Sequence, residues 1–191
     1  MKTLRLAAAM GLVAAIVGAG MIGCRGKPNP GSAMERAQMR SAAQAAINDF
    51  KAKDPSIERF FRTSEGFAIF PEVTTGALIV GGAHGNGEVY QQGRFIGFAD
   101  VSQASIGAQV GGQKFSQIIF FQNEAALESF KSGSLEFDAQ ASAVIAASGA
   151  ATTADFNRGV AVFTMPQGGA MVQAALGGQR FRFMPATATD R

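Results

Sequence analysis

The 191-residue sequence has few of the residues that build disulfide, metal or nucleophilic sites. It contains one cysteine, one histidine and no tryptophan. A single cysteine excludes an internal disulfide, and one cysteine with one histidine cannot form a structural zinc site of Cys and His ligands. The sequence also lacks a P-loop lysine and a G-x-S-x-G motif. These absences predict a protein that is not an enzyme and carries no cofactor or metal.

Carboxylates are the remaining groups that could support catalysis. The candidates are Glu65, Glu72, Glu88 and Asp100. A hydrolytic site would need two of them to converge in a pocket, whereas isolated acids on a protein surface are usually solvated. We therefore keep carboxylate catalysis only as an alternative.

Charged residues are also scarce, at 16% of the chain against 47% hydrophobic residues. This composition is too apolar for a disordered protein and predicts one packed domain. The formal charge of +3 falls to +1 if Lys2 and Arg5 are removed with a targeting segment. The overall charge therefore gives no reason to expect a nucleic-acid partner.

The first residues of the chain have the pattern of an export signal. Lys2 and Arg5 precede the stretch 6–23, which carries no charge. A membrane-spanning helix is the alternative, but the many alanines and glycines make this stretch weakly hydrophobic. We therefore predict a signal peptide over residues 1–23.

Residues 21–24 (MIGC) resemble a lipobox, the motif in which a cysteine receives diacylglycerol before the signal is cleaved. Each buried acyl methylene contributes about 0.8 kcal/mol, and stable anchoring needs more than one chain, as an acylated N-terminal cysteine provides. The resemblance implies lipid attachment at Cys24 and, with Arg25 next to it, a place in the outer membrane facing the periplasm or the cell surface. Residues 24–31, which include Pro28 and Pro30, form the predicted tether.

Two helices are predicted after the tether. Ser32 and Glu35 have the spacing of a capping box, and apolar residues then recur at helical spacing up to Phe50. Asp54 before Pro55 predicts the start of a second, short helix. Six basic residues lie in this region: Arg36, Arg40, Lys51, Lys53, Arg59 and Arg62.

These six side chains are candidates for contact with an anionic bilayer. Each Lys or Arg near such a surface contributes on the order of 1 kcal/mol, and a lipid anchor at Cys24 would hold the region close to it. The alternative is a solvated helix face in which four nearby acids are the ion-pair partners: Glu35, Asp49, Asp54 and Glu58. The residues alone leave both interpretations open.

From residue 66 onward, β-branched and aromatic runs alternate with glycine, which predicts short strands. Asn123 predicts the cap of a later helix that ends at Gly133. The predicted fold is α+β, with the N-terminal helices and this later helix packed on a glycine-rich antiparallel sheet, for which a barrel-like form is left open. The predicted strands cover residues 67–70, 77–80, 88–90, 95–98, 105–110, 115–121, 135–147, 160–165, 170–176 and 179–183.

The sequence contains a glycine-rich stretch around its one histidine and a short glycine-containing repeat. Residues 81–87 (GGAHGNG), around His84, lack the glycine order of a phosphate loop and are predicted to form a hairpin turn. Residues 111–115 (GGQKF) and 177–181 (GGQRF) repeat one pattern, which indicates either two similar hairpin units or chance. Lys114 and Arg180 stand at equivalent positions of this repeat, and we add both to the candidate lipid-binding residues.

Several motifs, taken in order along the chain, resemble the SYLF domain family. They are residues 64–73 (SEGFAIFPEV), the glycines of 76–87, the block 105–113 (SIGAQVGGQ), the segment 118–130 and the closing segments 160–163 and 168–178. The resemblance covers nearly all of residues 34–183. We therefore predict a SYLF-like domain over residues 32–185, followed by a tail at 186–191.

The resemblance implies binding of acidic lipids, including phosphoinositides, through a basic amphipathic N-terminal portion. The basic helical region, from Arg36 to Arg62, thereby becomes the candidate site for an anionic phospholipid membrane. Eukaryotic relatives also bundle actin, but an exported bacterial protein is not expected to meet actin. The alternative function is that of a structural or adaptor lipoprotein that binds a protein partner in the envelope.

Overall fold

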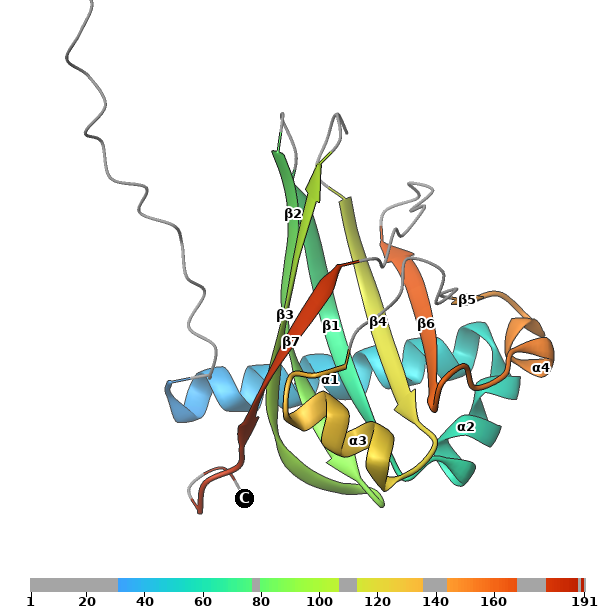
Figure 1. The fold of residues 1–191 in the computed structure, drawn as a ribbon, viewed down its shortest axis with the longest axis horizontal. Helices are drawn as coiled ribbons and strands as arrows, with labels where there is room; N and C mark the ends of the chain where they lie inside the picture. The colour runs from blue at the N-terminus through green and yellow to red at the C-terminus, as the bar shows by residue number, and fades with distance from the viewer. Residues whose placement is uncertain are drawn as a thin grey trace, which may run out of the picture.

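The computed structural model describes residues 31–76, 80–106, 113–135, 144–167, 178–188 and 190. These residues form helices packed on a seven-stranded sheet (Figure 1). The predicted α+β class is confirmed. The strands are β1 (Gly66–Gly76), β2 (Val80–Gln91), β3 (Arg94–Ile106), β4 (Gln113–Phe121), β5 (Val144–Ile145), β6 (Val160–Gln167) and β7 (Gln179–Pro185). The helices are α1 (Ala33–Lys53), the 3₁₀ turn η1 (Pro55–Ile57), α2 (Glu58–Thr63), α3 (Glu124–Lys131) and α4 (Ala150–Thr153).

The strand order is β5-β6-β4-β1-β2-β3-β7. Neighbouring strands are antiparallel, except for β5, which runs parallel to β6. The sheet is open, with β5 and β7 as its edges, so the barrel-like form that the sequence left open is not the one adopted.

The helices begin at the residues that the sequence indicated. Ser32 Oγ accepts from the Glu35 N–H at 3.1 Å, and a Glu35 carboxylate oxygen accepts from the Ser32 N–H at 2.8 Å. These reciprocal bonds satisfy two of the free N–H groups at the start of α1. Asp54 caps η1, and Asn123 caps α3 by accepting from the Ala126 N–H at 3.0 Å.

Each face of the sheet is covered by helices, and successive side chains of a strand point to opposite faces. Helix α1 crosses one face, together with α2 and α4, and α3 lies on the other (Figure 1). On β1, Ile69 packs in the core beneath α1, whereas Ala68 and Phe70 pack in the core beneath α3. The sheet is therefore the central layer between two apolar cores.

The sheet also curls around the core on the α3 side. Three strands separate β4 from β7, yet Gln117 on β4 and Gln179 on β7 exchange side-chain amide hydrogen bonds of 3.0 and 3.1 Å. Both amides are buried. This paired contact satisfies polar groups that would otherwise be costly to bury inside the curl.

The predicted hairpin turn at residues 81–87 is wrong, because this segment continues β2. His84 pairs with Thr74 on β1 and with Ser102 on β3, so its side chain stands on a strand. The actual turn between β2 and β3 lies at Gln92 and Gly93, which both have positive φ angles.

The glycines of this segment allow the backbone of β1 to approach closely. A Cβ on Gly85 would lie 2.6 Å from the main-chain oxygen of Glu72, and one on Gly87 would collide with the main-chain oxygen of Ile69. The pairing of β1 with β2 shifts register between Ile69 and Glu72, which is a β-bulge. Glycine in this strand therefore allows close approach at a bulge.

Other predicted elements are confirmed in longer or shorter forms. The strands expected at 67–70, 88–90, 95–98, 115–121, 160–165 and 179–183 lie within observed strands, and α3 matches the later helix. In the described part of 135–147 only Val144–Ile145 is a strand, and α4 was not predicted. The strand expected at 170–176, most of those at 77–80 and 105–110, and all of residues 1–30, including Cys24, lie outside the described residues.

Among the described residues, no helix combines the length and the apolar character needed to cross a membrane.

Candidate functional site

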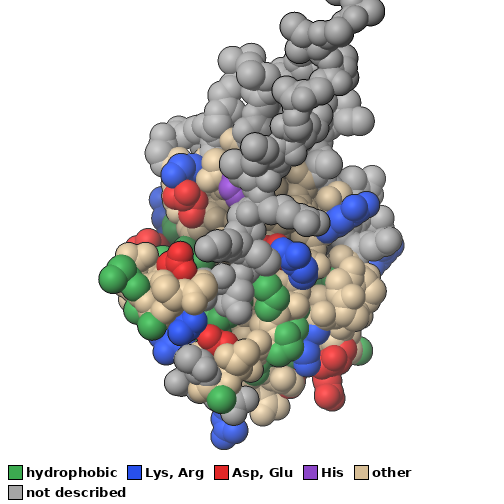
Figure 2. Space-filling model, turned by 90° about the vertical axis from the view of Figure 1, so that its left-hand side faces the viewer, with side chains coloured by type: hydrophobic (Ala, Val, Ile, Leu, Met, Phe, Trp, Pro, Cys, Tyr) green, Lys and Arg blue, Asp and Glu red, His purple; other side chains and the backbone are tan. Residues whose placement is uncertain are grey.

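The basic residues of the helical region divide into three groups. Arg36 and Arg40 lie at the start of α1, Arg59 lies within the contact between α2 and α4, and the remaining three lie where α1 ends and α2 follows. Figure 2, which views the left-hand side of Figure 1, shows basic and acidic side chains interspersed on that face. The contacts of each group decide which side chains are available to a ligand.

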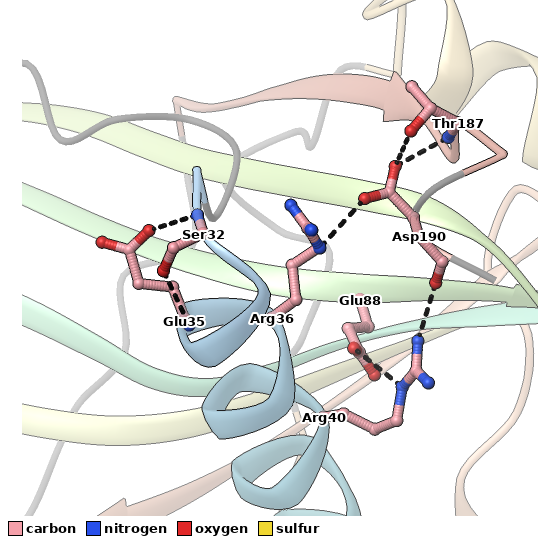
Figure 3. Close-up of polar contacts among 7 residues, drawn as sticks. All are labelled: Ser32, Glu35, Arg36, Arg40, Glu88, Thr187 and Asp190. Carbon is pink, nitrogen blue, oxygen red and sulfur yellow. Dashed lines mark hydrogen bonds and ion pairs between the residues drawn. The ribbon is translucent and has the colours of Figure 1, made fainter.

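The start of α1 places two arginines against acidic groups from distant parts of the chain (Figure 3). Arg36 Nε lies 3.3 Å from an Asp190 carboxylate oxygen. Arg40 donates to the Asp190 main-chain oxygen at 3.0 Å, and its Nε lies 4.0 Å from Glu88 Oε1. The Arg40 side chain is still 52% exposed, and its guanidinium lies 5.4 Å from the centre of the Phe95 ring. Arg40 is therefore held on one side and open to solvent on the other.

Asp190 is fixed as an anion by its own neighbours. Its second carboxylate oxygen accepts from the hydroxyl and the N–H of Thr187, both at 2.7 Å. These hydrogen bonds, with smaller contributions from the charges of Arg36 and Arg40, lower the pKa of Asp190 against the opposing effect of burial. No local pattern in the sequence indicates this contact, because Asp190 lies 150 residues from Arg40.

Glu88 is the second acid of the site and is fully buried on β2. One of its oxygens accepts from the Tyr90 hydroxyl at 2.5 Å, and the other, Oε1, has no hydrogen-bond partner among the described residues. Burial raises the pKa of Glu88, although the Tyr90 bond and the Arg40 charge act in the opposite direction. Burial and the contact with Glu88 also raise the pKa of Tyr90. The carboxyl group is therefore poorly compensated in this position.

At the other end of α1, the basic side chains are closer to solvent. Lys51 forms an ion pair with Glu58 at 2.9 Å, and its ammonium lies 4.4 Å from the centre of the Phe61 ring. Lys53 and Arg62 are exposed and form no ion pair within the described part of the chain. The ion pair of Lys51 matches the alternative of a solvated helix face. Lys53 and Arg62 remain available to a ligand.

Arg59 has a structural position. It donates to the main-chain oxygens of Ala151, at 3.0 Å, and of Ala154. Its guanidinium lies 4.3 Å from the centre of the Phe60 ring. These bonds satisfy carbonyl groups around the end of α4 and join it to α2, so Arg59 is engaged within the fold.

Lys114 and Arg180 lie on the sheet, apart from the start of α1. The pairing registers place them in one cross-strand row, which runs through Thr74, His84 and Ser102. Lys114 forms an exposed ion pair with Glu72 at 2.9 Å. Arg180 is exposed and has no ion-pair partner among the described residues. Lys114 and Arg180 thus lie in the same row of the sheet, and neither is among the described contacts of Arg36 and Arg40.

The four carboxylates considered for catalysis have four different partners. Glu65 accepts from Gln91 at 2.8 Å, Glu72 pairs with Lys114, Glu88 binds Tyr90, and Asp100 binds Arg182. Within the described ranges, no group of three His, Cys, Asp or Glu side chains is arranged to hold a metal ion. The four carboxylates therefore do not converge, and the start of α1 is the stronger candidate for a binding site.

Comparison with known proteins bears on this fold. Residues 102–185 match the model of the family described as "Ysc84: Las17-binding protein actin regulator". This part of the chain is similar to the Ysc84/SYLF domain family. The resemblance found in the sequence is thus confirmed. A weaker similarity extends to the "Beta cell expansion factor A" of Aeromonas veronii, which is 22% identical over 154 residues, or 80% of this chain and 59% of that protein.

The matched part of the Ysc84/SYLF domain runs from within β3 to the end of β7. It includes Lys114 and Arg180 but ends before Asp190 and begins after α1 and Glu88. The arginines at the start of α1 and their acidic partners therefore lie outside the matched range.

Proposed function

We propose that this protein is a non-enzymatic module that binds anionic phospholipid membranes, with phosphoinositide-like head groups as the ligand class implied by the family resemblance. The proposal rests on one observation: the start of α1 presents two arginines at the end of the molecule closest in sequence to Cys24. Only eight residues separate Cys24 from Ala33, the first residue of α1. Fully extended, the chain between them spans at most about 30 Å.

A lipid anchor at Cys24 would keep the start of α1 close to the bilayer. Met34, in the first turn, is 72% exposed and offers an apolar side chain at the same end. The first turns of α1 and the segment that follows β7 lie on the same side of the molecule (Figure 1). Apolar contact and basic charge together are the usual basis of binding to an anionic membrane surface.

Anchoring and location are part of the same proposal. The mature protein would begin at Cys24, carry its acyl chains there and reside in the outer membrane. Its folded domain would then meet abundant anionic phospholipids or glycolipids. Arg36 and Arg40 are the primary contacts in this account, and Lys53 and Arg62 are secondary ones. Lys114 and Arg180 form a row of their own farther along the strands and are not part of this contact.

Vesicle sedimentation tests the proposal. Residues 25–191, which retain every described helix and strand, are mixed with vesicles of phosphatidylcholine alone or with added phosphatidylglycerol. We expect sedimentation with the anionic vesicles only, and we expect it to decrease as salt screens the charges. Equal sedimentation with both vesicle types, or binding that salt does not weaken, would contradict the proposal.

A protein partner is the second candidate, supported by the edge strand β5. Ile145 on β5 is 51% exposed, and an edge strand presents unpaired main-chain groups to another chain. The family is also described as one of Las17-binding proteins, which is a protein-binding function. Site-specific cross-linking in cells from position 147, an exposed position just after β5, tests this candidate. Capture of one partner that Ile145→Lys abolishes would favour it, whereas identical cross-links in both forms would count against it.

A further inference from the structure

We propose that the arginine pair at the start of α1 is an anion site occupied by Asp190, which stands where a lipid phosphate binds. Residues 186–188 and 190 thus act as a strap, and it must release Arg36 and Arg40 before the membrane contact forms. This inference rests on the proposed function and concerns the regulation of the same site.

The geometry of Asp190 resembles that of an anionic ligand. Asp190 is held against Thr187, because its N–H donates to the Thr187 main-chain oxygen at 3.0 Å. Asp190 presents one carboxylate oxygen to Arg36 and its main-chain oxygen to Arg40. The two arginines are four residues apart on α1, so their side chains lie on neighbouring positions of one helix face. Paired guanidinium groups of this kind also suit a phosphate group.

The strap is held by few polar contacts. The Ala186 N–H donates to the Ile96 main-chain oxygen at 2.9 Å, and this bond extends the pairing of β7 with β3 by one residue. Beyond this point, within the described residues, the polar contacts of Asp190 are with Thr187, Arg36 and Arg40. Displacement of Asp190 from the arginines therefore leaves its contact with Thr187 intact and exchanges one set of charge-assisted contacts for another.

Glu88 restrains Arg40 from beneath. The separation of 4.0 Å between Arg40 Nε and Glu88 Oε1 is too long for a hydrogen bond, and that oxygen has no other partner among the described residues. Arg40 is thus held by a long ion pair and by one bond to a carbonyl oxygen, while half of its side chain is exposed. A membrane phosphate can compete with these contacts without disruption of the buried face of α1.

The decisive experiment compares Asp190→Asn with Asp155→Asn in the vesicle assay. Both substitutions remove one negative charge, but Asp155 is exposed, and its described contact is with the N–H of Phe156. We expect Asp190→Asn to raise the affinity for phosphatidylglycerol vesicles about two- to fivefold over the control, the range that loss of a single competing ion pair supports. Equal affinities of the two variants would overturn the strap.

A second variant keeps the test valid if the contact of Asp190 with Thr187 is disturbed. Glu88→Gln retains an acceptor for Tyr90 but removes the charge beneath Arg40, so its affinity should also exceed that of the control. Arg36→Gln with Arg40→Gln, added to Asp190→Asn, should cancel the gain. A gain that persists without the arginines would overturn the proposal.

The outcomes also separate the strap from the proposed function. If the unaltered protein binds anionic vesicles and both single variants match the control, the strap is wrong and lipid binding stands. If neither the unaltered protein nor any variant binds anionic vesicles above neutral ones, the proposed function fails, and the strap fails with it.

Discussion

The ionisation of single buried residues changes the stability of this fold, and Glu88 is the clearest case. A carboxyl group with a raised pKa in the folded state favours folding when it is protonated. Its stabilising contribution is fully present below the ordinary pKa of 4.5 and is lost as the pH rises through the raised value. Ionised Glu88 therefore lowers the free energy of unfolding at neutral pH, a pattern often found at functional sites.

Glu88→Gln should accordingly stabilise the protein at neutral pH. We expect the free energy of unfolding to rise by about 1 kcal/mol or more at pH 8, with no gain at pH 4, where the glutamate is already protonated. Urea unfolding at both pH values measures this difference. Glu124→Gln, at an exposed position on α3, is the control and should change stability little. A loss of stability at pH 8 in Glu88→Gln would show that the Arg40 ion pair outweighs the cost of burial.

Asp54 shows the opposite balance. It is buried, but it accepts from the Ser56 N–H and hydroxyl and from the N–H groups of Gly149 and Ala151, at 2.6 to 3.1 Å. Burial raises the pKa of Asp54, and the four hydrogen bonds together lower it below the ordinary 3.8. Asp54 therefore stabilises the fold above that pH, and this contribution is lost as the pH falls through the lowered pKa.

Asp54→Ala should destabilise the protein by about 2–3 kcal/mol, because it removes the cap of η1 and leaves buried donors without an acceptor. Chemical denaturation at pH 7 measures the loss. Asp49→Ala, at an exposed position on α1, provides the comparison and should cost far less. Equal effects of the two substitutions would contradict the role given to Asp54.

At the scale of elements, the strands and helices were largely predictable, and the glycine-rich part of β2 was not. The capping box at Ser32 and the cap at Asn123 are local patterns, so the starts of α1 and α3 follow from the sequence. Gly85 and Gly87 resemble turn residues in isolation. Glycine is needed at these positions because the β1 backbone approaches closely. That contact joins two separate segments, so a local sequence pattern cannot reveal it.

This interpretation predicts different costs for two glycine substitutions. Gly87→Ala would force a Cβ against the main chain of Ile69 and the ring of Phe70, so we expect a loss well above 2 kcal/mol. Gly93→Ala has open space around the new methyl group but a φ of 75°, so it should cost about 1–2 kcal/mol. Thermal unfolding of both variants measures the contrast. A milder effect at Gly87 than at Gly93 would refute the close approach of β1.

At the scale of the whole molecule, the sequence identified the arginines of the candidate site but not their partners. Arg36 and Arg40 belong to a visible basic helix, and Lys51 pairs with the nearby Glu58, as the local alternative proposed. Glu88 and Asp190 come from β2 and from the segment after β7, and only the folded sheet brings them to α1. The sequence therefore revealed the positive charge of the site and not the acids that oppose it.

The proposed anchor makes a prediction for the intact cell. The mature protein should lack residues 1–23, carry acyl chains on Cys24 and fractionate with the outer membrane. Mass spectrometry of the N-terminal peptide measures the modification, and Cys24→Ser should abolish it. Gly26→Ser, two residues along the predicted tether, is a control that should leave acylation unchanged. An unmodified Cys24 in the membrane-extracted protein would contradict the anchor.

The central claim, that the start of α1 is the membrane-binding surface, is tested most directly by charge-matched double variants. Arg36→Gln with Arg40→Gln removes two positive charges from the site, and Arg94→Gln with Lys131→Gln removes two from positions elsewhere on the surface. The measurement is the affinity of residues 25–191, in each form, for phosphatidylglycerol-containing vesicles at low salt. We predict a loss of about tenfold or more for the α1 pair, at about 1 kcal/mol for each residue, and a much smaller loss for the control pair. Equal losses in the two double variants would contradict the account.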